Sequence, residues 1–413
     1  MGNNVSQDGK PAKQGLVSVA EARAAMLAGT KTLKPETVAL EHALGRVLAD
    51  DVSASRDQPP FDVSAMDGYA VRSADTPGLL RLAGESAAGR GFDGICDQGS
   101  TIRISTGAAI PLGADSVVIQ EDVCRECNGI AVPVSHSGQN IRPRGGDFKT
   151  GTLLLPHGRF LDGVGLSLAA ASGLAALPVV RQPRIALLSS GDELAAPGTT
   201  PGPWQIFDSA TFGISALVRS WGGVAHRLGV ARDDVSSIAR AAEQGLRDSD
   251  LLVVIGGASV GDHDHARPAL MQLGLQLTVE KVAVRPGKPT WFGKTTVGPV
   301  LGLPGNPASA LVCAQLFLKP MLAAMQGRDP EPQFRRAVLA HALPANGPRE
   351  HYLRGALNSD SGGRLTARAF EDQDSSLISV FAAANALICL PPSAPATPVG
   401  ALVDVLPLDG AGC

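Results

Sequence analysis

The sequence predicts a multidomain α/β protein built around a doubly wound, mostly parallel sheet. Its 413 residues exceed the roughly 150 residues of an average domain. Strand-like and helix-like segments alternate between residues 184 and 325, as they do in parallel sheets covered by helices. On both sides of this region, short β-type runs are broken by many of the 48 glycines and 30 prolines. We therefore expect β-rich domains beside a central α/β domain.

The first expected element is a helix that begins at Ser18. Ser18 and Glu21 stand three residues apart, as in a capping box, and Gly29 is placed to end the helix. Another helix is expected over Leu161–Ser172. Between the two helices, four short runs predict a separate β-rich domain: Tyr69–Arg72, Thr101–Ser105, Ser116–Gln120 and Ile130–Val134.

The central region places a helix after each expected strand. The strands are Arg184–Leu188, Val224–Gly229, Leu251–Ile255 and Val300–Leu303. The helices are Ser209–Trp221, Asp233–Arg247, Asp264–Leu273 and Pro307–Met325. From about Asp329 short strands return, at Arg336–Leu339, Tyr352–Leu357 and Ala386–Leu390, and they predict a small β-barrel or sandwich.

Composition argues against several classes of function. The 36 Lys and Arg against 39 Asp and Glu give a net charge of −3, so no broad basic surface for nucleic acid is expected. The uncharged stretch 295–318 contains prolines and glycines, which favours strand, loop and core helix over a membrane span. Cys124 and Cys127 form an isolated Cys-x-x-Cys pair, which we interpret as reduced thiols of a cytoplasmic protein rather than a zinc site.

Three loops follow expected strands at the edge where open α/β sheets bind ligands. They are rich in small residues and cover 189–194 (SSGDEL), 256–264 (GGASVGDHD) and 304–307 (PGNP). Backbone N–H groups in such loops can approach an anion at a helix N-terminus. One glycine turn is usually structural, but three at one edge predict a phosphate-bearing ligand. The spacing matches neither a P-loop nor a dinucleotide fingerprint.

Carboxylates are expected at the same edge: Glu193, Asp233, Asp262 and Asp264. Oxygen ligands of this kind suit Mg²⁺, which binds few protein groups and keeps substrate phosphates. Asp233 and Asp262 could equally cap helices.

A basic segment follows in the chain. Strand alternation places Lys281 and Arg285 on one face, and Gly287 permits close approach of the backbone. Lys288 lies between turn-forming residues in Pro-Gly-Lys-Pro, a frame that favours an oxyanion seat over a simple surface lysine.

Six segments together resemble the motifs of the molybdopterin molybdenumtransferase family, the MoeA proteins and the E domain of gephyrin. In order they are PPFDVSAMDGYAVR (59–72), STGAAIPLGADSVVIQED (105–122), IRPRGGDFKTG (141–151), SSGDEL (189–194), GGASVGDHDH (256–265) with VRPGKP (284–289), and GLPGNPASAL (302–311). The resemblance covers nearly the whole chain from about Leu16.

This resemblance implies four domains. They are a split elongated domain (16–50 and 142–180), an inserted β-rich domain (51–141), a molybdopterin-binding α/β domain (181–328) and a C-terminal β-barrel (329–413). It also implies a homodimer whose active site lies between the α/β domain of one subunit and the β insert of the other.

The implied reaction inserts molybdate into adenylylated molybdopterin, releases AMP and uses Mg²⁺. Carried over by position, the catalytic residues are Asp67, Asp147, Glu193, Asp233, Asp264, Lys281 and Lys288, with Glu193 and Asp264 as metal ligands. The implied substrate-binding residues are Gly256, Gly257, Ser259, Gly261, Asp262, Arg285, Pro289, Pro304, Gly305 and Asn306, with Arg349 or Arg354 and Ser375 or Ser376 near molybdate. A molybdopterin adenylyltransferase and recipient molybdoenzymes are implied partners.

The sequence departs from the family pattern at a few positions. Val63 and Ala210 stand where polar residues are common, Ile255 stands where Ser is common, and Arg285 replaces a Lys. These departures leave a second hypothesis open, a catalytically silent paralogue that carries cofactor or clusters partner proteins. A dinucleotide oxidoreductase ranks last, because the glycine fingerprint is missing.

Overall fold

The computed structural model describes residues 16–256 and 265–408. These residues form two compact units, each with its own cores. Unit 1 comprises the described parts of 1–36, 45–47 and 180–413, and unit 2 comprises 37–44 and 48–179.

Unit 1 contains a six-stranded sheet. In spatial order its strands are β16 (Val224–Ala231), β13 (Arg184–Ser190), β17 (Leu251–Ile255), β21 (Pro299–Leu303), β20 (Trp291–Lys294) and β18 (Gln276–Val279). The first four run parallel, which confirms the mostly parallel sheet that the sequence predicts. The antiparallel strand β20 and the edge strand β18 were not anticipated.

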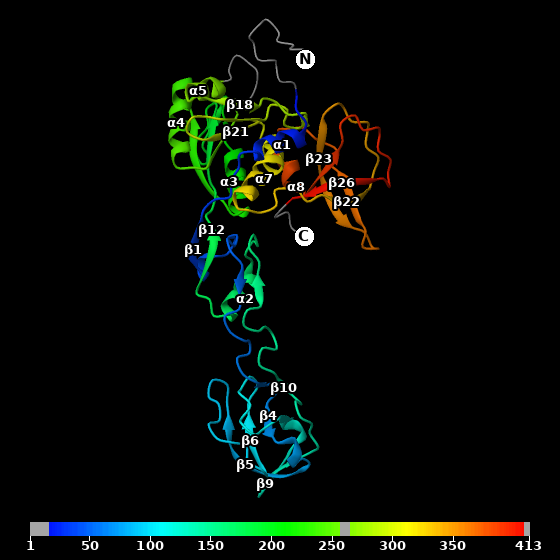
Figure 1. The fold of residues 1–413 in the computed structure, drawn as a ribbon. Coiled ribbons are helices and arrows are strands. Elements are labelled where there is room, and N and C mark those ends of the chain that lie inside the picture. The colour runs from blue at the N-terminus through cyan, green and yellow to red at the C-terminus, as the bar shows by residue number, and fades with distance from the viewer. Residues whose placement is uncertain (1–15, 257–264, 409–413) are drawn as a thin grey trace, which may run out of the picture. The chain divides into compact units, whose positions relative to one another are not determined.

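Helices cover both faces of this sheet, which confirms the doubly wound architecture (Figure 1). One face carries α4 (Val235–Arg247) and α5 (Ala266–Gln272). The other carries α1 (Val19–Leu27), α3 (Ala210–Ser220), α6 (Pro307–Cys313) and α7 (Lys319–Met325). A short parallel pair, β14 (Leu194–Ala195) and β15 (Ile206–Phe207), lies between β13 and α3 in the chain.

The predicted capping box starts α1. The Ser18 hydroxyl accepts the Glu21 N–H at 3.2 Å, and the Glu21 carboxylate accepts the Ser18 N–H at 2.9 Å. The helix buries Val19, Ala22 and Met26 in the core of unit 1.

One helical rod runs from Pro307 to Met325. It widens into a π segment, Ala314–Leu318, between α6 and α7. Pro320 has no N–H to donate to the preceding turn, which is a physical reason for the change in winding at this point. The rod is apolar and long enough to cross a membrane, but 83% of its most apolar window is buried in the protein. It is therefore a core helix, as the sequence predicts for stretch 295–318.

The C-terminal strands of unit 1 close into a barrel rather than a sandwich. They are β22 (Arg335–Leu339), β23 (Glu350–Ser359), β24 (Leu365–Ala369), β25 (Ala386–Leu390) and β26 (Leu402–Pro407), with helix α8 (Ile378–Ala383). The order β23-β24-β22-β26-β25 returns to β23 through a further pairing. Strand β19 (Val284–Arg285) joins this barrel at β23.

Unit 2 contains a second six-stranded sheet, whose strands β4, β5, β6 and β9 are labelled in Figure 1. Its strands are β7 (Ser116–Ile119), β4 (Gly68–Val71), β6 (Ser100–Ile104), β5 (Gly78–Ser86), β9 (Gly129–Val132) and β8 (Cys124–Glu126). The remaining elements are β3 (Val63–Ser64) with β10 (Ile141–Arg142), β2 (Val52–Ser53) with β11 (Leu153–Leu155), helix α2 (Gly163–Ala171), and single turns η1 (Leu40–His42), η2 (Ser73–Asp75) and η3 (Gln120–Asp122). The pair β1 (Pro35–Ala39) and β12 (Ala176–Val180) also belongs here, except that residues 35–36 and 180 are assigned to unit 1.

Gly302 is required by the packing of Trp291. The two residues are paired across β20 and β21, and the buried indole lies over the glycine. A Cβ on Gly302 would lie 1.9 Å from the indole ring.

We expect Gly302→Ala to lower the free energy of unfolding by about 1–3 kcal/mol, because the ring must move to admit the methyl group. Urea unfolding monitored by tryptophan fluorescence measures the change. The matched control is Gly347→Ala, where a Cβ meets nothing within 4 Å. Equal losses in the two variants would contradict the packing argument.

Candidate functional site

Three loops meet at the carboxyl edge of the unit 1 sheet. Gly256 follows β17 with φ +87°, and a Cβ there would lie 3.0 Å from the Ser190 carbonyl oxygen at the end of β13. A Cβ on Gly305, after β21, would lie 3.5 Å from the Gly256 Cα. The structure thus brings Gly256 against Gly305 and the end of β13, as the sequence predicts. Gly257, Ser259, Gly261, Asp262 and Asp264 lie outside the described residues.

Two buried serines end β13 at this edge. Ser189 and Ser190 are 1% and 5% exposed, and neither hydroxyl has a hydrogen-bond partner among residues 16–256 and 265–408. Burying an unpaired hydroxyl costs about 1–3 kcal/mol, so such a group is a candidate for contact with a ligand. Sequence analysis missed both residues as site candidates, although the motif 189–194 contains them.

Glu193 folds back over Gly191. Gly191 has φ +145°, and a Cβ there would lie 2.4 Å from a Glu193 carboxylate oxygen, so only glycine fits. Glu193 is exposed, and its carboxylate has no hydrogen-bond partner within the described part of the chain.

Asp233 is not the cap of α4. The cap is Asp234, whose carboxylate accepts the Ser237 N–H at 2.8 Å. Hydrogen bonds from the Ser237 side chain and backbone lower the pKa of Asp234. The Asp233 N–H instead donates to the Asp192 carboxylate at 3.3 Å, which joins the loops after β13 and β16. Within the part of the chain that the structure describes, the carboxylate of Asp233 accepts no hydrogen bond.

Of the basic residues in this segment, Arg285 lies in the barrel strand β19 rather than in the α/β sheet, and Lys281 and Lys288 lie on either side of that strand. Val282 and Val284 are fully buried, so Lys281 and Arg285 fall on the other side of the alternation, as expected. In the parallel pairing of β19 with β23, Arg285 lies opposite His351 in the backbone register.

The Pro-Gly-Lys-Pro turn (286–289) packs against helix α6. Gly287 has φ +118°, and a Cβ there would lie 2.2 Å from the Cys313 sulfur. Lys288 is exposed on this turn, with Pro289 after it.

The charges of three guanidinium groups act on the buried ring of His351. Burial first, and then the charges of Arg285, Arg349 and Arg354, together lower the pKa of His351 to about 4. The imidazole is therefore neutral at pH 7, and the positive charge of the cluster belongs to the arginines.

Arg354 and the two candidate serines have separate roles. Arg354 is fully buried and donates to the Asp374 carbonyl at 2.7 Å, which orders the chain before Ser375. The Ser375 hydroxyl accepts a hydrogen bond from the Asn306 amide at 2.7 Å. The Ser376 hydroxyl donates to Asp374 at 2.6 Å. Of the alternatives left open by the sequence, Ser375 is the serine that reaches the sheet edge.

Unit 2 holds its own cluster around Asp67. The Asp67 carboxylate accepts the N–H and hydroxyl of Thr106 at 2.7 and 3.0 Å. The backbone bond, the hydroxyl bond and the charge of Arg103 hold the pKa of Asp67 below its usual value. A Cβ on Gly68 would lie 2.1 Å from the Val118 carbonyl oxygen, so the Asp-Gly turn needs its glycine.

Asp147 lies on a segment that Asp57 holds in place. The Asp57 carboxylate accepts the Thr150 N–H at 2.8 Å, the Thr150 hydroxyl at 2.9 Å and the Arg144 guanidinium at 2.6 Å. These contacts lower the pKa of Asp57 to about 2, the Thr150 N–H having the largest effect. The stabilisation by these contacts with the ionised Asp57 is therefore fully present above the ordinary titration range of Asp, and it is lost as the pH falls through 2.

Sequence reasoning missed Asp57 and Thr106 as site candidates. Thr106 lies inside a quoted motif, but Asp57 lies just outside one, so only its contacts reveal its role.

Within the described residues, no three His, Cys, Asp or Glu side chains are grouped so that they could hold a metal ion. Cys124 and Cys127 are exposed free thiols.

The comparisons with known proteins cover nearly the whole chain. Residues 17–173 match the family model described as MoeA N-terminal region (domain I and II). Residues 186–324 match a probable molybdopterin binding domain, and residues 336–408 match the MoeA C-terminal region (domain IV).

Similar curated proteins carry one name. Molybdopterin molybdenumtransferase 2 of Mycobacterium tuberculosis is 34% identical over 375 residues, 87% of this chain and 92% of that protein. Molybdopterin molybdenumtransferase of Haemophilus influenzae is 35% identical over 361 residues, 86% of this chain and 89% of that protein.

A solved structure, the molybdopterin biosynthesis MoeA protein of Pyrococcus horikoshii, shares the fold. It aligns with a TM-score of 0.81 and 30% identity, and covers 96% of this chain and 100% of that chain. From the family models, the relatives and this fold, the chain belongs to the molybdopterin molybdenumtransferase (MoeA) family.

Proposed function

We propose that this protein is a molybdopterin molybdenumtransferase, which inserts molybdate into adenylylated molybdopterin and releases AMP. The observation that carries the proposal is the meeting of the loops after β13, β17 and β21, with Gly256 against Gly305. Close backbone approach of this kind suits a phosphate-bearing ligand at the carboxyl edge of the sheet.

The cations of unit 1 give the site its preference for anions. Molybdate and the pyrophosphate of the pterin are both anionic, and each pair of unit charges at 4 Å repels by about 1 kcal/mol in water and more when desolvated. We assign Lys281, Arg285 and Lys288 to offset that repulsion. Arg349 donates to the carbonyl of Val284, the residue before Arg285, at 3.3 Å. Ser375, held by Asn306, offers a polar contact from the barrel.

Two carboxylates, Glu193 and Asp264, are suitable residue types to bind one magnesium ion together. Mg²⁺ binds through one or two carboxylates, substrate phosphates and water. Glu193, whose carboxylate has no described partner, would hold the ion together with Asp264. The bound ion would supply charge neutralisation at the phosphoric anhydride.

The chemistry needs no covalent enzyme intermediate. A water molecule attacks the anhydride and AMP leaves. The two dithiolene sulfurs of the pterin then bind the molybdenum of molybdate, and one molybdate oxygen leaves as water with the two thiol protons. Lys288 and Arg285 stabilise the charge that grows on the departing phosphate. Asp67, kept ionised by Thr106, and Asp233 orient water and substrate groups.

The departures from the family pattern do not favour a silent paralogue. Val63, Ala210 and Ile255 are 7%, 6% and 3% exposed, so their apolar side chains are absorbed by packing. Arg285 keeps the positive charge of the Lys that it replaces. A carrier or scaffold role remains as an outcome of the assay below.

We also propose where the protein acts and which proteins supply its substrate and receive its product. We place the protein in the cytoplasm, where a molybdopterin adenylyltransferase would supply its substrate and molybdoenzymes would receive its product.

The direct test is AMP release from adenylylated molybdopterin by the purified protein. We expect release to require both molybdate and Mg²⁺ and to leave molybdenum on the pterin. Asp67→Ala and Lys288→Ala should each lower turnover by roughly 10²-fold or more. The control is Asp93→Ala, an exposed carboxylate of unit 2 outside the cluster. Tight binding without turnover in the unaltered protein would instead indicate a carrier.

The contacts of Asp57 with Thr150 and Arg144 give a second prediction. Asp57→Ala should lower turnover by about tenfold, because the segment carrying Asp147 loses its hydrogen-bond acceptor. Hydrogen exchange over 144–151 should become faster, and Asp57→Asn should restore part of both, since its amide oxygen still accepts the Thr150 N–H.

The matched control for Asp57→Ala is Asp115→Ala. Asp115 accepts the N–H and hydroxyl of Ser73 at 2.6 and 2.7 Å elsewhere in unit 2. Exchange over 144–151 that speeds up equally in both variants would show general loosening and remove the positioning role from Asp57.

We also propose that the protein acts as a homodimer in which each active site takes unit 1 residues from one copy and unit 2 residues from the other. In support, each cluster is incomplete alone: unit 2 has no glycine loops at the end of a parallel sheet, and Asp67 belongs to unit 2. Asp67→Ala and Glu193→Ala proteins, each inactive, are refolded together. Shared sites predict recovery of about a quarter of full activity, because random pairing makes half of the dimers mixed and each mixed dimer has one intact site. No recovery would place each site within one chain.

A further inference from the structure

Unit 1 contains a cavity at the end of the sheet opposite to the candidate site. Its volume is about 410 Å³, and it is bordered by Asp250, directly before β17, and by Pro299 at the start of β21. The candidate site lies at the other ends of the same strands, which are five residues long. A strand of that length spans about 16 Å, so the two sites are separate.

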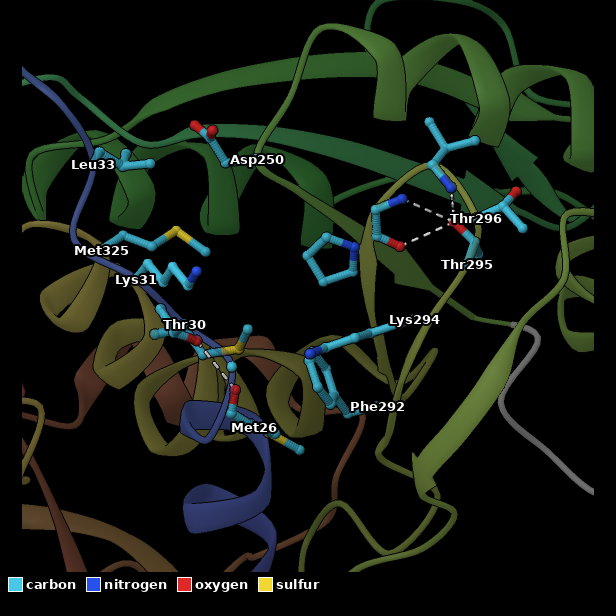
Figure 2. Close-up of a pocket in the computed structure, with 15 residues that line it drawn as sticks. Met26, Thr30, Lys31, Leu33, Asp250, Phe292, Lys294, Thr295, Thr296 and Met325 are labelled. Carbon is cyan, nitrogen blue, oxygen red and sulfur yellow. Dashed lines mark hydrogen bonds between the residues drawn. The ribbon is translucent and has the colours of Figure 1, made fainter.

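The floor of the cavity is apolar. It is formed by Met26 of α1, Phe292 of β20 and Met325 of α7, which are labelled in Figure 2, together with Met321 of α7. Each of the four is no more than 5% exposed. Methionine side chains are flexible and adapt to the shape of a ligand. The volume falls within the range of roughly 300–1,000 Å³ that small-molecule sites occupy.

The hydrogen-bonding side chains at the rim are mostly satisfied. Asp250 accepts two hydrogen bonds from Arg181, at 2.7 and 3.0 Å, so its charge is balanced. The Thr30 hydroxyl donates to the Met26 carbonyl at 3.1 Å, and the Thr295 hydroxyl donates to the Gly298 carbonyl at 2.9 Å. These groups therefore offer little to a ligand.

Two lysines remain. Among the described side chains that line the cavity, the ammonium groups of Lys31 and Lys294 have neither a hydrogen-bond nor an ion-pair partner. They come from different elements, Lys31 from the chain after α1 and Lys294 from the end of β20 (Figure 2). Lys294 lies across Gly29: a Cβ there would be 2.4 Å from its Nζ.

We propose that this cavity binds a small organic monoanion with an apolar body, of the class of aryl and medium-chain carboxylates. The apolar floor takes the body of the ligand, and the two ammonium groups take its carboxylate. A nucleotide or a sugar is disfavoured, because its hydroxyl and amino donors would be buried without free acceptors. The site is separate from the proposed transferase site, and its test does not use turnover.

The test measures binding of 4-phenylbutyrate, 2-naphthoate and octanoate to the full-length protein by calorimetry. We expect at least one to bind with a dissociation constant below about 1 mM and to raise the thermal unfolding midpoint. The corresponding neutral alcohol should bind about tenfold more weakly. Failure of all three acids to bind, or equal binding of acid and alcohol, would overturn the proposal.

Methionine methyl NMR locates the ligand. Binding should shift the methyl signals of Met26, Met321 and Met325. The signals of Met66 and Met271, which are 43% and 59% exposed and do not line the cavity, should stay in place. Shifts confined to Met66 and Met271 would place the ligand elsewhere and overturn the assignment.

Charge removal tests the role of the lysines. The double variant Lys31→Met/Lys294→Met keeps the apolar stems and removes both charges, so we expect carboxylate binding to fall about tenfold or more while alcohol binding is unchanged. Lys34→Met is the matched control, because Lys34 is exposed on the same segment but does not line the cavity. Equal carboxylate affinity in the double variant and the control would remove the lysines from the site.

Discussion

The constraint on which unit 1 depends is the burial of the helical rod Pro307–Met325. The rod carries apolar side chains all round, so it is stable only if other elements cover every side. The sheet covers one side, α1 and α3 cover others, and barrel residues such as Tyr352 and Leu387 complete the enclosure in one continuous core. The N-terminal helix, the α/β layers and the barrel are therefore joined by apolar packing rather than by surface ion pairs, which contribute little.

The same rod places three functional features along its length. At its N-terminal end, Asn306 contacts Ser375 of the barrel and so fixes the edge where the glycine loops meet. Midway, Cys313 packs against Gly287 and sets the turn that presents Lys288. At the C-terminal end, Met321 and Met325 form the floor of the second cavity. A packing change in the rod would consequently reach all three.

Backbone N–H groups and hydroxyls position the carboxylates in both units. Thr106 holds Asp67 and Thr150 holds Asp57, and each pair of bonds lowers the pKa of the acid that accepts it. Both acids are therefore ionised at pH 7, and Asp67, which is exposed, is reachable by a charged substrate, whereas Asp57 is half-buried against Arg144. Glu193 differs, because its carboxylate lies over Gly191 and accepts no hydrogen bond from the described residues.

The sequence by itself determined the doubly wound sheet, the capping box of α1 and the convergence of the glycine loops, because local periodicity and turn chemistry decide these features. It did not determine that β19 pairs with the barrel, that Asp234 rather than Asp233 caps α4, or that Ser375 rather than Ser376 reaches Asn306. Only the tertiary structure decided these, because each depends on a choice between neighbouring residues or strands that local propensity leaves equal. The role of Asp57 and the cavity between α1, β20 and α7 likewise arise from contacts between segments far apart in the chain, which no local pattern encodes.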